Sequence, residues 1–411
     1  MRVAKRMNEK TLSQRAWLVL LMLVVCLPRV TIDAYLPSLP AMADALHGTD
    51  AQLQLTLTMY MVGYALSMLI AGPLSDRHGR RPVLVGGLLV YLCATAACAL
   101  STSVSAIVVA RIFQALGGCS GTVIGRVIVR ERFPTGIQAA MLSSISAGMA
   151  LSPVVAPLAG SFVAQWLGWR GVFALLGVAG LTALLMVCRH LPETRAPAVA
   201  NSRRESLVST YATLLRDRSF LRYSLAISFI YCTYFPFVAE SSTLFQRQLH
   251  VSGQVYAAIF GVTVLGYLIG SAVFRRTSGR WPTDGVIACA AIINLGGAAA
   301  LWGAAAVAPL SAWSIVVPMF TIMLSVGIAI PACQFAVLQP FTHIAGTASG
   351  LFFFIQMAIT AICGGLLSGL ANGSAQPMIS LTVGASIAFF IVFAGLRSRS
   401  VAAGGSIASR S

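Results

Sequence analysis

The sequence predicts an all-α membrane protein in which twelve transmembrane helices form two pseudo-symmetric six-helix bundles. Composition is the first observation: 57% of the 411 residues are hydrophobic and only 9% are charged, whereas soluble domains carry about 25% charged residues. The second is a series of long apolar stretches, and the third is a turn that recurs in both halves. Together these observations exclude a soluble fold.

Each apolar stretch can cross the hydrocarbon core of a bilayer, which takes about 20 helical residues. The first stretch follows a basic segment, as a signal peptide would, but it is too long for a signal core and no small-residue cleavage site follows it. We therefore expect it to remain as a helix. The twelve expected spans are 16–36, 53–74, 82–100, 104–127, 138–165, 169–189, 220–245, 255–275, 284–306, 312–332, 346–371 and 376–397.

A long polar stretch rich in serine and arginine divides these spans six and six. The expected organisation is an N-terminal segment (1–15), a first bundle (16–189), a linker (190–219), a second bundle (220–397) and a C-terminal tail (398–411).

An internal repeat supports this division. Gly79-Arg80-Arg81-Pro82 lies between the second and third spans, and Gly279-Arg280-Trp281-Pro282 lies between the eighth and ninth, 200 residues later. The same turn at the same topological position indicates duplication of a six-helix unit.

The basic residues predict the orientation. Of the 28 lysines and arginines, all but four lie in segments on the side of the two termini, and basic residues are retained in the cytoplasm. We therefore expect both termini to be cytoplasmic. The net charge of +17 would also attract anionic lipids of the inner leaflet. Nucleic acid is not an expected partner, because no basic run is interleaved with aromatic residues.

Apart from charges within two residues of a span end, four charged residues fall within the spans: Arg29, Asp33, Arg111 and Glu240. A charge there costs about 2.5–3.5 kcal/mol on insertion scales unless it faces protein or water. Asp33 follows Arg29 by four residues, so both lie on one helix face. The arginine favours the ionised carboxylate and burial favours the neutral acid, which makes Asp33 a candidate proton carrier. The alternative is a static ion pair that only neutralises Arg29.

The other candidates have weaker support. Glu240 is either a second protonatable site or a group facing periplasmic water at a frayed helix end. Arg111 keeps its charge at every relevant pH, so it can tune an acid, hold an anion or form a structural pair. Four aromatic residues either line an amphipathic pocket or serve as packing: Tyr35, Tyr60, Tyr64 and Tyr234.

Several motifs resemble one transporter family. The segment from Gly72 to Pro82, GPLSDRHGRRP, resembles the loop signature of the major facilitator superfamily. Within it, three segments resemble the bicyclomycin/chloramphenicol-resistance (Bcr/CflA-like) branch of twelve-helix drug:proton antiporters. They are TIDAYLPSLP (31–40), RIFQALGG (111–118) and AGTASG (345–350). The resemblance covers essentially the whole chain and implies the major facilitator fold.

The resemblance also implies roles for individual residues. It places an acid at Asp33 and associates Arg111 and Gln114 with proton transfer or substrate binding. Pro153, Pro157 and Gly160 resemble a loosened exporter motif of the fifth helix. The resemblance further implies a latch, a set of contacts at the loop that stabilises the outward-facing state. In the second half of the chain Arg276 occupies the position of Asp76, so a symmetric latch is doubtful. The latch residues are Gly72, Asp76, Arg77, Gly79, Arg80 and Arg81.

The function that fits best is proton-coupled efflux, by alternating access, of a small amphipathic drug or metabolite across the bacterial inner membrane. Alternatives are export of an anionic metabolite such as a carboxylate siderophore, and proton-coupled uptake. An enzyme is disfavoured because the histidines are dispersed, and no Walker motif indicates ATP as the energy source. The cysteines form no Cys-x-x-Cys pair, so no metal site is expected. We expect no cofactor besides the proton gradient, and a monomer whose partners are substrate, protons and lipid.

Overall fold

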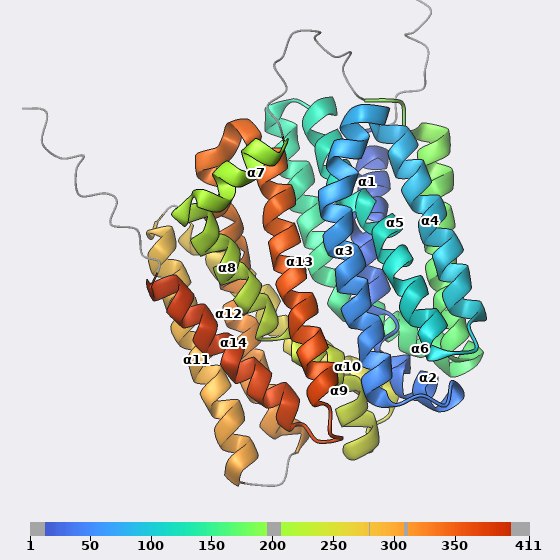
Figure 1. Ribbon diagram of the computed structural model, residues 1–411, viewed down its shortest axis with the longest axis vertical. Coiled ribbons are helices and arrows are strands. Elements are labelled where there is room, and N and C mark those ends of the chain that lie inside the picture. Colours follow the sequence, from blue (N-terminus) through green and yellow to red (C-terminus); the bar gives the residue numbers. More distant parts are fainter. Residues whose placement is uncertain (1–12, 195–206, 279, 308–310, 396–411) are drawn as a thin grey trace, which may run out of the picture. The chain divides into compact units, whose positions relative to one another are not determined.

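The all-helical prediction is confirmed. The computed structural model describes residues 13–194, 207–278, 280–307 and 311–395 (Figure 1). Within these ranges the regular elements are helices, and the β-type contact found there is an isolated bridge between Ser278 and Trp281.

The described residues form two compact units. The first holds residues up to 200 together with Ser252–Ala258, and the second holds 201–251 and the residues from Ile259 onward. The helices of the first unit are α1 (Gln14–Asp33), η2 (Leu36–Ser38), α2 (Leu39–Ala45), α3 (Asp50–His78), α4 (Arg80–Leu100), α5 (Val104–Arg132) and α6 (Thr135–His190).

The second unit is also helical throughout its described residues. Its α7 lies inside the segment expected to be a linker, so that segment is helical over ten residues, while residues 195–206 lie outside the described ranges. The elements that follow α6 are α7 (Leu207–Arg216), α8 (Arg218–Cys232), α9 (Phe235–Thr243), η3 (Leu244–Gln248), α10 (Gly253–Thr277), α11 (Thr283–Val307), α12 (Ala312–Leu338), η4 (Gln339–Ile344), α13 (Ala345–Leu370) and α14 (Gln376–Gly395). The first residues of α10, up to Ala258, belong to the first unit and the rest belong to the second.

Ten helices in the described ranges are long and apolar enough to cross a membrane. The twelve expected spans differ from these ten at two places. The expected spans 138–165 and 169–189 are joined in α6, which leaves helical geometry only at Gly168, with φ +67°. The expected span 220–245 is divided into α8 and α9, neither of which reaches the length of a span by itself.

The first expected span of each bundle is interrupted at an equivalent point. Helix α1 ends at Asp33 and α8 ends at Cys232, and a Tyr-x-Pro sequence follows each end, at Tyr35–Pro37 and at Tyr234–Pro236. Proline lacks an N–H group and clashes with the preceding turn, so an α-helix cannot continue through it without a kink or break. The expected span 16–36 therefore ends at Asp33, and the expected span 220–245 is divided after Cys232.

A second repeated turn supports duplication. Leu46-His47-Gly48-Thr49 precedes α3, and Leu249-His250-Val251-Ser252 precedes α10. Both histidines adopt left-handed backbone geometry, with φ +52° and +53°. The residue two positions later caps the following helix in each case. The Thr49 hydroxyl accepts the backbone N–H of Gln52, and the Ser252 hydroxyl accepts that of Val255.

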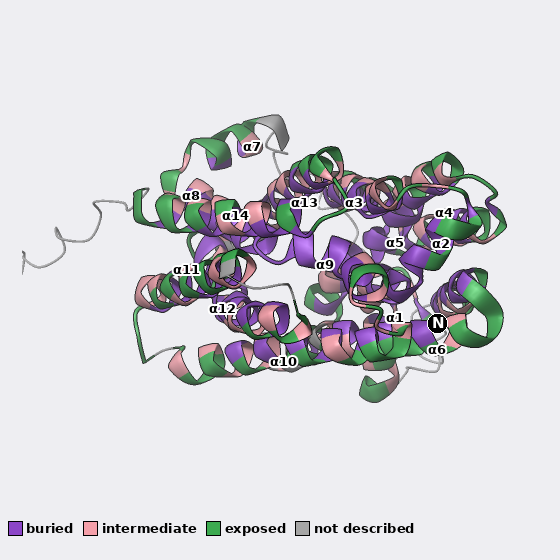
Figure 2. Cartoon of the chain, turned by 90° about the horizontal axis from the view of Figure 1, so that it is seen from below, coloured by how far each residue is buried: buried purple, intermediate pink, exposed green. Residues whose placement is uncertain are grey.

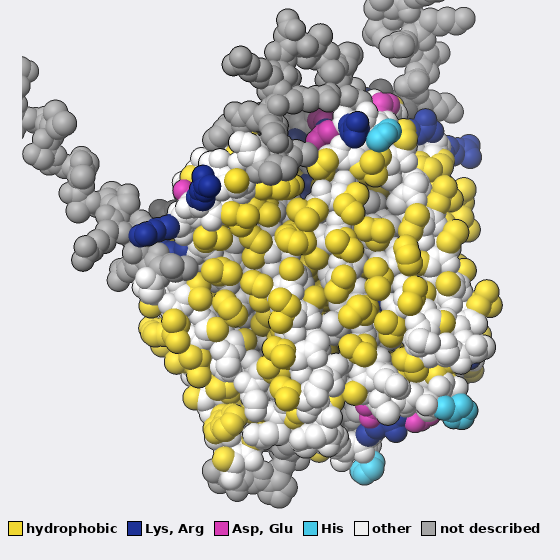
Figure 3. Space-filling model, viewed as in Figure 1, with side chains coloured by type: hydrophobic (Ala, Val, Ile, Leu, Met, Phe, Trp, Pro, Cys, Tyr) yellow, Lys and Arg dark blue, Asp and Glu magenta, His cyan; other side chains and the backbone are white. Residues whose placement is uncertain are grey.

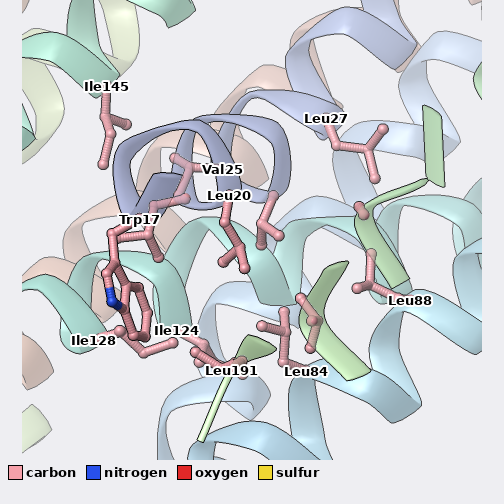
Figure 4. Packing of buried hydrophobic residues seen from close by; sticks show 14 of the residues in the cluster. Trp17, Leu20, Val25, Leu27, Leu84, Leu88, Ile124, Ile128, Ile145 and Leu191 are labelled. Atoms are coloured by element: carbon pink, nitrogen blue, oxygen red, sulfur yellow. The ribbon is translucent and has the colours of Figure 1, made fainter. Parts of the chain in front are cut away.

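Tight apolar packing holds the first unit together. Trp17, Leu20, Leu84, Ile124 and Ile145, from four helices, belong to one buried cluster (Figure 4). Exposed positions lie on the outward faces of the helices (Figure 2), and many of them are large apolar residues such as Val19, Leu89 and Phe162. On the face in Figure 3, hydrophobic side chains cover the helix lengths and charged ones lie toward the helix ends. Apolar faces of this kind suit contact with lipid.

Candidate functional site

Asp33 lies where α1 stops. Its side chain is fully buried, and its Oδ2 accepts hydrogen bonds from Arg29 Nε at 3.1 Å and from Ser152 Oγ at 3.1 Å. Its other oxygen, Oδ1, is buried and has no hydrogen-bond partner among the described residues. The predicted Arg29–Asp33 ion pair is therefore present, and one acceptor atom of the acid is not engaged by it.

Small residues on α6 allow that helix to approach Asp33 closely. Gly148, Ser152, Ala156 and Gly160 are spaced four residues apart, so they share one helix face. A Cβ atom on Gly160 would lie 1.7 Å from the backbone oxygen of Ala34, the residue after Asp33. Helix α6, which carries the predicted exporter motif, thus contacts the end of α1 and supplies Ser152 as a hydrogen-bond donor to Asp33.

Pro153 and Pro157 lie in the same part of α6, and both are buried. They stay within helical geometry, because the departure from helical backbone angles in α6 falls at Gly168.

Arg111 lies in a buried aromatic box in the first unit. Its guanidinium carbon lies 4.2 Å from the centre of the Tyr35 ring and 4.3 Å from that of Tyr60. The side chain is completely buried, and no described carboxylate lies within 4 Å of it. Cation–π contacts of this kind contribute about 2 kcal/mol or more when desolvated. Two of the four aromatic residues predicted to line a pocket thus hold an arginine.

A chain of hydrogen bonds connects Arg111 to α4. Arg111 Nη1 donates to Gln114 Oε1 at 2.6 Å, and Gln114 Nε2 donates to Thr95 Oγ1 at 2.8 Å. The Nε and Nη2 atoms of Arg111 have no hydrogen-bond partner in the described ranges. Arg111 and Gln114 therefore act as one buried polar unit that holds a positive charge near the break in α1.

The remaining predicted cavity residues are also buried. Tyr64 is 8% exposed and Tyr234 is 5% exposed, and the Tyr234 ring packs on Tyr231 with centroids 4.7 Å apart. Glu240 lies in the middle of α9 and is 7% exposed. Of the two sequence alternatives, Glu240 thus occupies the buried position in the second unit rather than a frayed, water-facing end.

The predicted latch residues meet at the α3–α4 turn. Arg80 Nη1 donates to Ser75 Oγ at 2.8 Å and to Asp76 Oδ1 at 2.5 Å, while its Nη2 donates to Glu131 Oε1 at 2.8 Å. Arg80 is buried, so these charge-assisted bonds tie the turn to the end of α5. Gly72 is half-buried in α3, and Arg77 is exposed at its end.

Glu193, which follows α6, completes the latch. Its carboxylate oxygens accept hydrogen bonds from the backbone N–H groups of Arg80 at 2.9 Å and of Arg81 at 3.2 Å. These N–H groups lie in the first turn of α4, where the helix itself provides no acceptor. Gly79 has φ +99°, and a Cβ there would lie 2.5 Å from Glu193 Oε2. Glycine at this position is favoured by the positive φ of the turn, and it leaves room for the Glu193 carboxylate.

The second unit has a different cluster at the equivalent end. Arg222 Nη1 donates to Asp284 Oδ2 at 2.9 Å and its Nε donates to the Phe393 carbonyl at 3.1 Å, which joins α8, α11 and α14. The Tyr223 hydroxyl donates to the same Asp284 carboxylate at 2.6 Å. The acid of this cluster, Asp284, lies at the start of α11, and Gly279 lies outside the described residues.

Sequence reasoning missed several partners of the predicted residues. Ser152, Thr95, Glu131 and Glu193 are far in sequence from the residues they bind, so only the fold brings them together. One signal was present: an acid in or soon after a basic helix end suggests a partner for nearby arginines, as at Glu131 in the last turn of α5 and at Glu193 three residues after α6. No group of three metal-ligating side chains occurs in the part of the chain that the structure describes.

Comparisons with known proteins agree with these features. A family model described as Major Facilitator Superfamily matches residues 21–365. A chloramphenicol resistance protein of Pseudomonas aeruginosa is 30% identical over 91% of this chain and 90% of its own length. Multidrug resistance protein D of Escherichia coli is 26% identical over 89% of this chain and 92% of its length.

Solved structures show the same fold. A D-xylose-proton symporter matches with a TM-score of 0.73 at 14% identity, over 92% of this chain and 97% of its own. A bacterial homologue of the human lysosomal transporter Spinster, inward-facing and occupied, matches with a TM-score of 0.68 at 16% identity, over 92% of this chain and 95% of its own.

Proposed function

The chain belongs to the major facilitator superfamily, and we propose that it is a proton-coupled exporter of small amphipathic compounds. It is a transporter and not an enzyme. Relatives named for resistance to chloramphenicol and bicyclomycin support its assignment to the bicyclomycin/chloramphenicol-resistance branch of the superfamily. Its apolar helices make it a multi-pass protein of the bacterial inner membrane.

We propose twelve crossings with both termini in the cytoplasm. Gly168 divides α6 into two spans, and α8 with α9 forms one interrupted span, so the ten long helices become twelve crossings. The latch arginines and the Arg222 cluster would then lie at the cytoplasmic surface, where basic residues are retained.

The buried Asp33 carries the proposal. It lies at a broken helix, a feature that frames ion and substrate sites in transporters, and the partners of its Oδ2 come from two different helices. A relative movement of α1 and α6 would remove Ser152 and leave the ionised acid poorly solvated. Proton binding and helix movement are therefore coupled, because each conformational state has its own affinity for the proton.

Arg111 has a supporting role in this proposal. Its charge is permanent, so it does not carry the proton, and its aromatic box and Gln114 hold it in one place. The α3–α4 latch supports alternating access in the same way, since its bonds join α3, α4, α5 and the segment after α6 in the state that the structure shows. We propose that these bonds break when the protein changes state.

The test is transport in inverted membrane vesicles with chloramphenicol, the compound in the name of a relative. With an acidic interior, vesicles with the wild-type protein should accumulate the drug and release protons as they do so. Asp33→Asn should abolish this exchange, whereas Asp44→Asn, at an exposed acid on α2, should not. Equal accumulation by Asp33→Asn and wild type would refute the proposed coupling. Drug movement in the opposite sense would identify an uptake system.

A further inference from the structure

A groove lies on the outside of the first unit, between α3 and α4, with α5 beneath it. Its volume is about 450 Å³, and it runs along α3 from Ser67 to His78 and along α4 from Pro82 to Val90. A helix from Ser67 to His78 is about 16 Å long, which is about half of the thickness of a hydrocarbon core. The groove therefore has the depth of one leaflet, and it ends at the turn that carries the latch.

The groove opens to the surroundings of the helices. Ile70 and Leu74 on α3 and Val90 on α4 line it, and each of them is 40–47% exposed. Hydrophobic side chains cover α3 and α4 on the face in Figure 3, and charged and histidine side chains lie at the latch end of these helices. Charged side chains mark the edge of the hydrocarbon core, so in a membrane the opening faces acyl chains and its His78 end lies at the level of the headgroups.

The lining of the groove suits an apolar occupant. It contains two hydroxyl groups, and the protein itself accepts a hydrogen bond from each. Ser67 Oγ donates to the Leu116 carbonyl at 2.9 Å, and Ser120 Oγ donates to the Gly117 carbonyl at 2.6 Å. Apart from these serines and His78, the lining consists of aliphatic residues, proline and glycine. A polar drug would lose hydrogen bonds there, whereas a hydrocarbon chain would not.

Gly86 leaves the space for such a chain. A Cβ atom on Gly86 would meet no atom within 4 Å, whereas one on Gly87 would lie 2.2 Å from Ser120 Oγ. Gly87 therefore lets α4 approach α5 closely. The packing of the helices does not require glycine at position 86, and the space beside Gly86 is available to an occupant.

We propose that this groove binds one phospholipid of the leaflet on the latch side, with an acyl chain between α3 and α4 and the phosphate at His78. His78 is exposed, and its Nδ1 lies 3.2 Å from the Leu74 carbonyl oxygen, which holds the ring at the end of the groove. The acids Asp76 and Glu131 of the neighbouring latch accept hydrogen bonds from Arg80. Their charges are thus compensated, and a phosphate at His78 does not face an unpaired acid.

The inference goes beyond the proposed function, because it concerns a bound lipid and not the transported compound. It requires neither Asp33 nor proton coupling, so each of the two proposals can fail without the other. The competing occupants of the groove are a substrate molecule and a second copy of the chain.

The test is native mass spectrometry of the full-length protein in detergent, with palmitoyl-oleoyl phosphatidylglycerol as the probe. A diacylglycerol with the same two chains is the control that lacks the phosphate. Wild type should retain one phosphatidylglycerol and less of the diacylglycerol. His78→Ala should reduce the retention of phosphatidylglycerol to that of the diacylglycerol, because it removes the group that meets the phosphate.

Two substitutions of glycine test the place of the lipid. Gly86→Phe puts a ring into the groove, so this variant should lose the retained phosphatidylglycerol. Gly296→Phe is the matched control and should retain it, since Gly296 is an exposed glycine of α11 whose Cβ would also meet no atom within 4 Å. Thermal unfolding of both variants shows whether they are folded.

Each of four results would overturn the inference. Wild type that retains no phosphatidylglycerol does so without any variant, and therefore independently of how the variants fold. Retention by folded Gly86→Phe equal to that of wild type would place the lipid elsewhere. Equal retention of the diacylglycerol by wild type would remove the role of the phosphate. Loss of a dimer or of bound chloramphenicol in Gly86→Phe, without loss of lipid, would assign the groove to a second copy of the chain or to the substrate.

Discussion

The contact between Gly160 and Ala34 is expected to determine whether the first unit can form its acid site. A Cβ on Gly160 would lie 1.7 Å from the Ala34 oxygen, 2.7 Å from its carbonyl carbon and 3.1 Å from its Cα, all of them backbone atoms. Real Cβ contacts are not shorter than 3.0 Å, so in Gly160→Ala α6 must move away from α1 by about 1.3 Å. No flexible side chain can absorb this shift.

Overpacking of this kind costs about 1–3 kcal/mol. At about 2–4 °C per kcal/mol for a unit of this size, the unfolding temperature of Gly160→Ala should fall by about 2–12 °C. Thermal unfolding of the purified protein in detergent, followed by tryptophan fluorescence, measures this change. Gly177→Ala, in the same helix, is the matched control because its Cβ would meet only Thr95 Cγ2 at 3.9 Å. A Gly160→Ala protein as stable as wild type would refute the argument that backbone contact holds α6 against α1.

Two further substitutions test the charge clusters at the helix ends. Arg80→Ala removes the hydrogen bonds to Asp76 and Glu131, which are exposed residues, and should lower stability by about 1.5–3 kcal/mol, the contribution of hydrogen bonds to charged groups. Arg132→Ala, at an exposed arginine of the α5 end that carries Glu131, should change the unfolding temperature little. Arg222→Ala should destabilise the second unit to a similar extent, since Arg222 joins three helices, and exposed Arg218 supplies its control. Both pairs are measured by thermal unfolding, and equal effects of target and control would contradict the assigned contacts.

The sequence predicted most of the helices because membrane insertion places strong constraints on composition. Apolar stretches, helix length and basic ends are local properties, and they located the long helices to within a few residues. The interruptions after Asp33 and Cys232 are also local, since each precedes a Tyr-x-Pro sequence. The interruptions were missed because hydropathy is averaged over a window of about 20 residues. A single proline changes that average little, so the whole stretch still reads as one apolar span.

The candidate site was predictable only in part, for a physical reason. A charge inside an apolar span is visible in the sequence, so Asp33, Arg29 and Arg111 could be singled out. Their partners were not visible, because Ser152 lies 119 residues from Asp33 and is an ordinary polar residue in a helix. The aromatic box around Arg111 was missed for the same reason, since tyrosines at helical spacing fit packing equally well.

Proton release on substrate binding tests the central claim most directly. Purified protein in weakly buffered detergent solution, at a pH where Asp33 is partly protonated, should release protons when chloramphenicol is added, if substrate binding favours the state in which Asp33 is ionised, as the proposed coupling requires. Asp33→Asn should release none, while Asp44→Asn should behave as wild type. Chloramphenicol binding without proton release by wild type, or equal release by Asp33→Asn, would contradict the account.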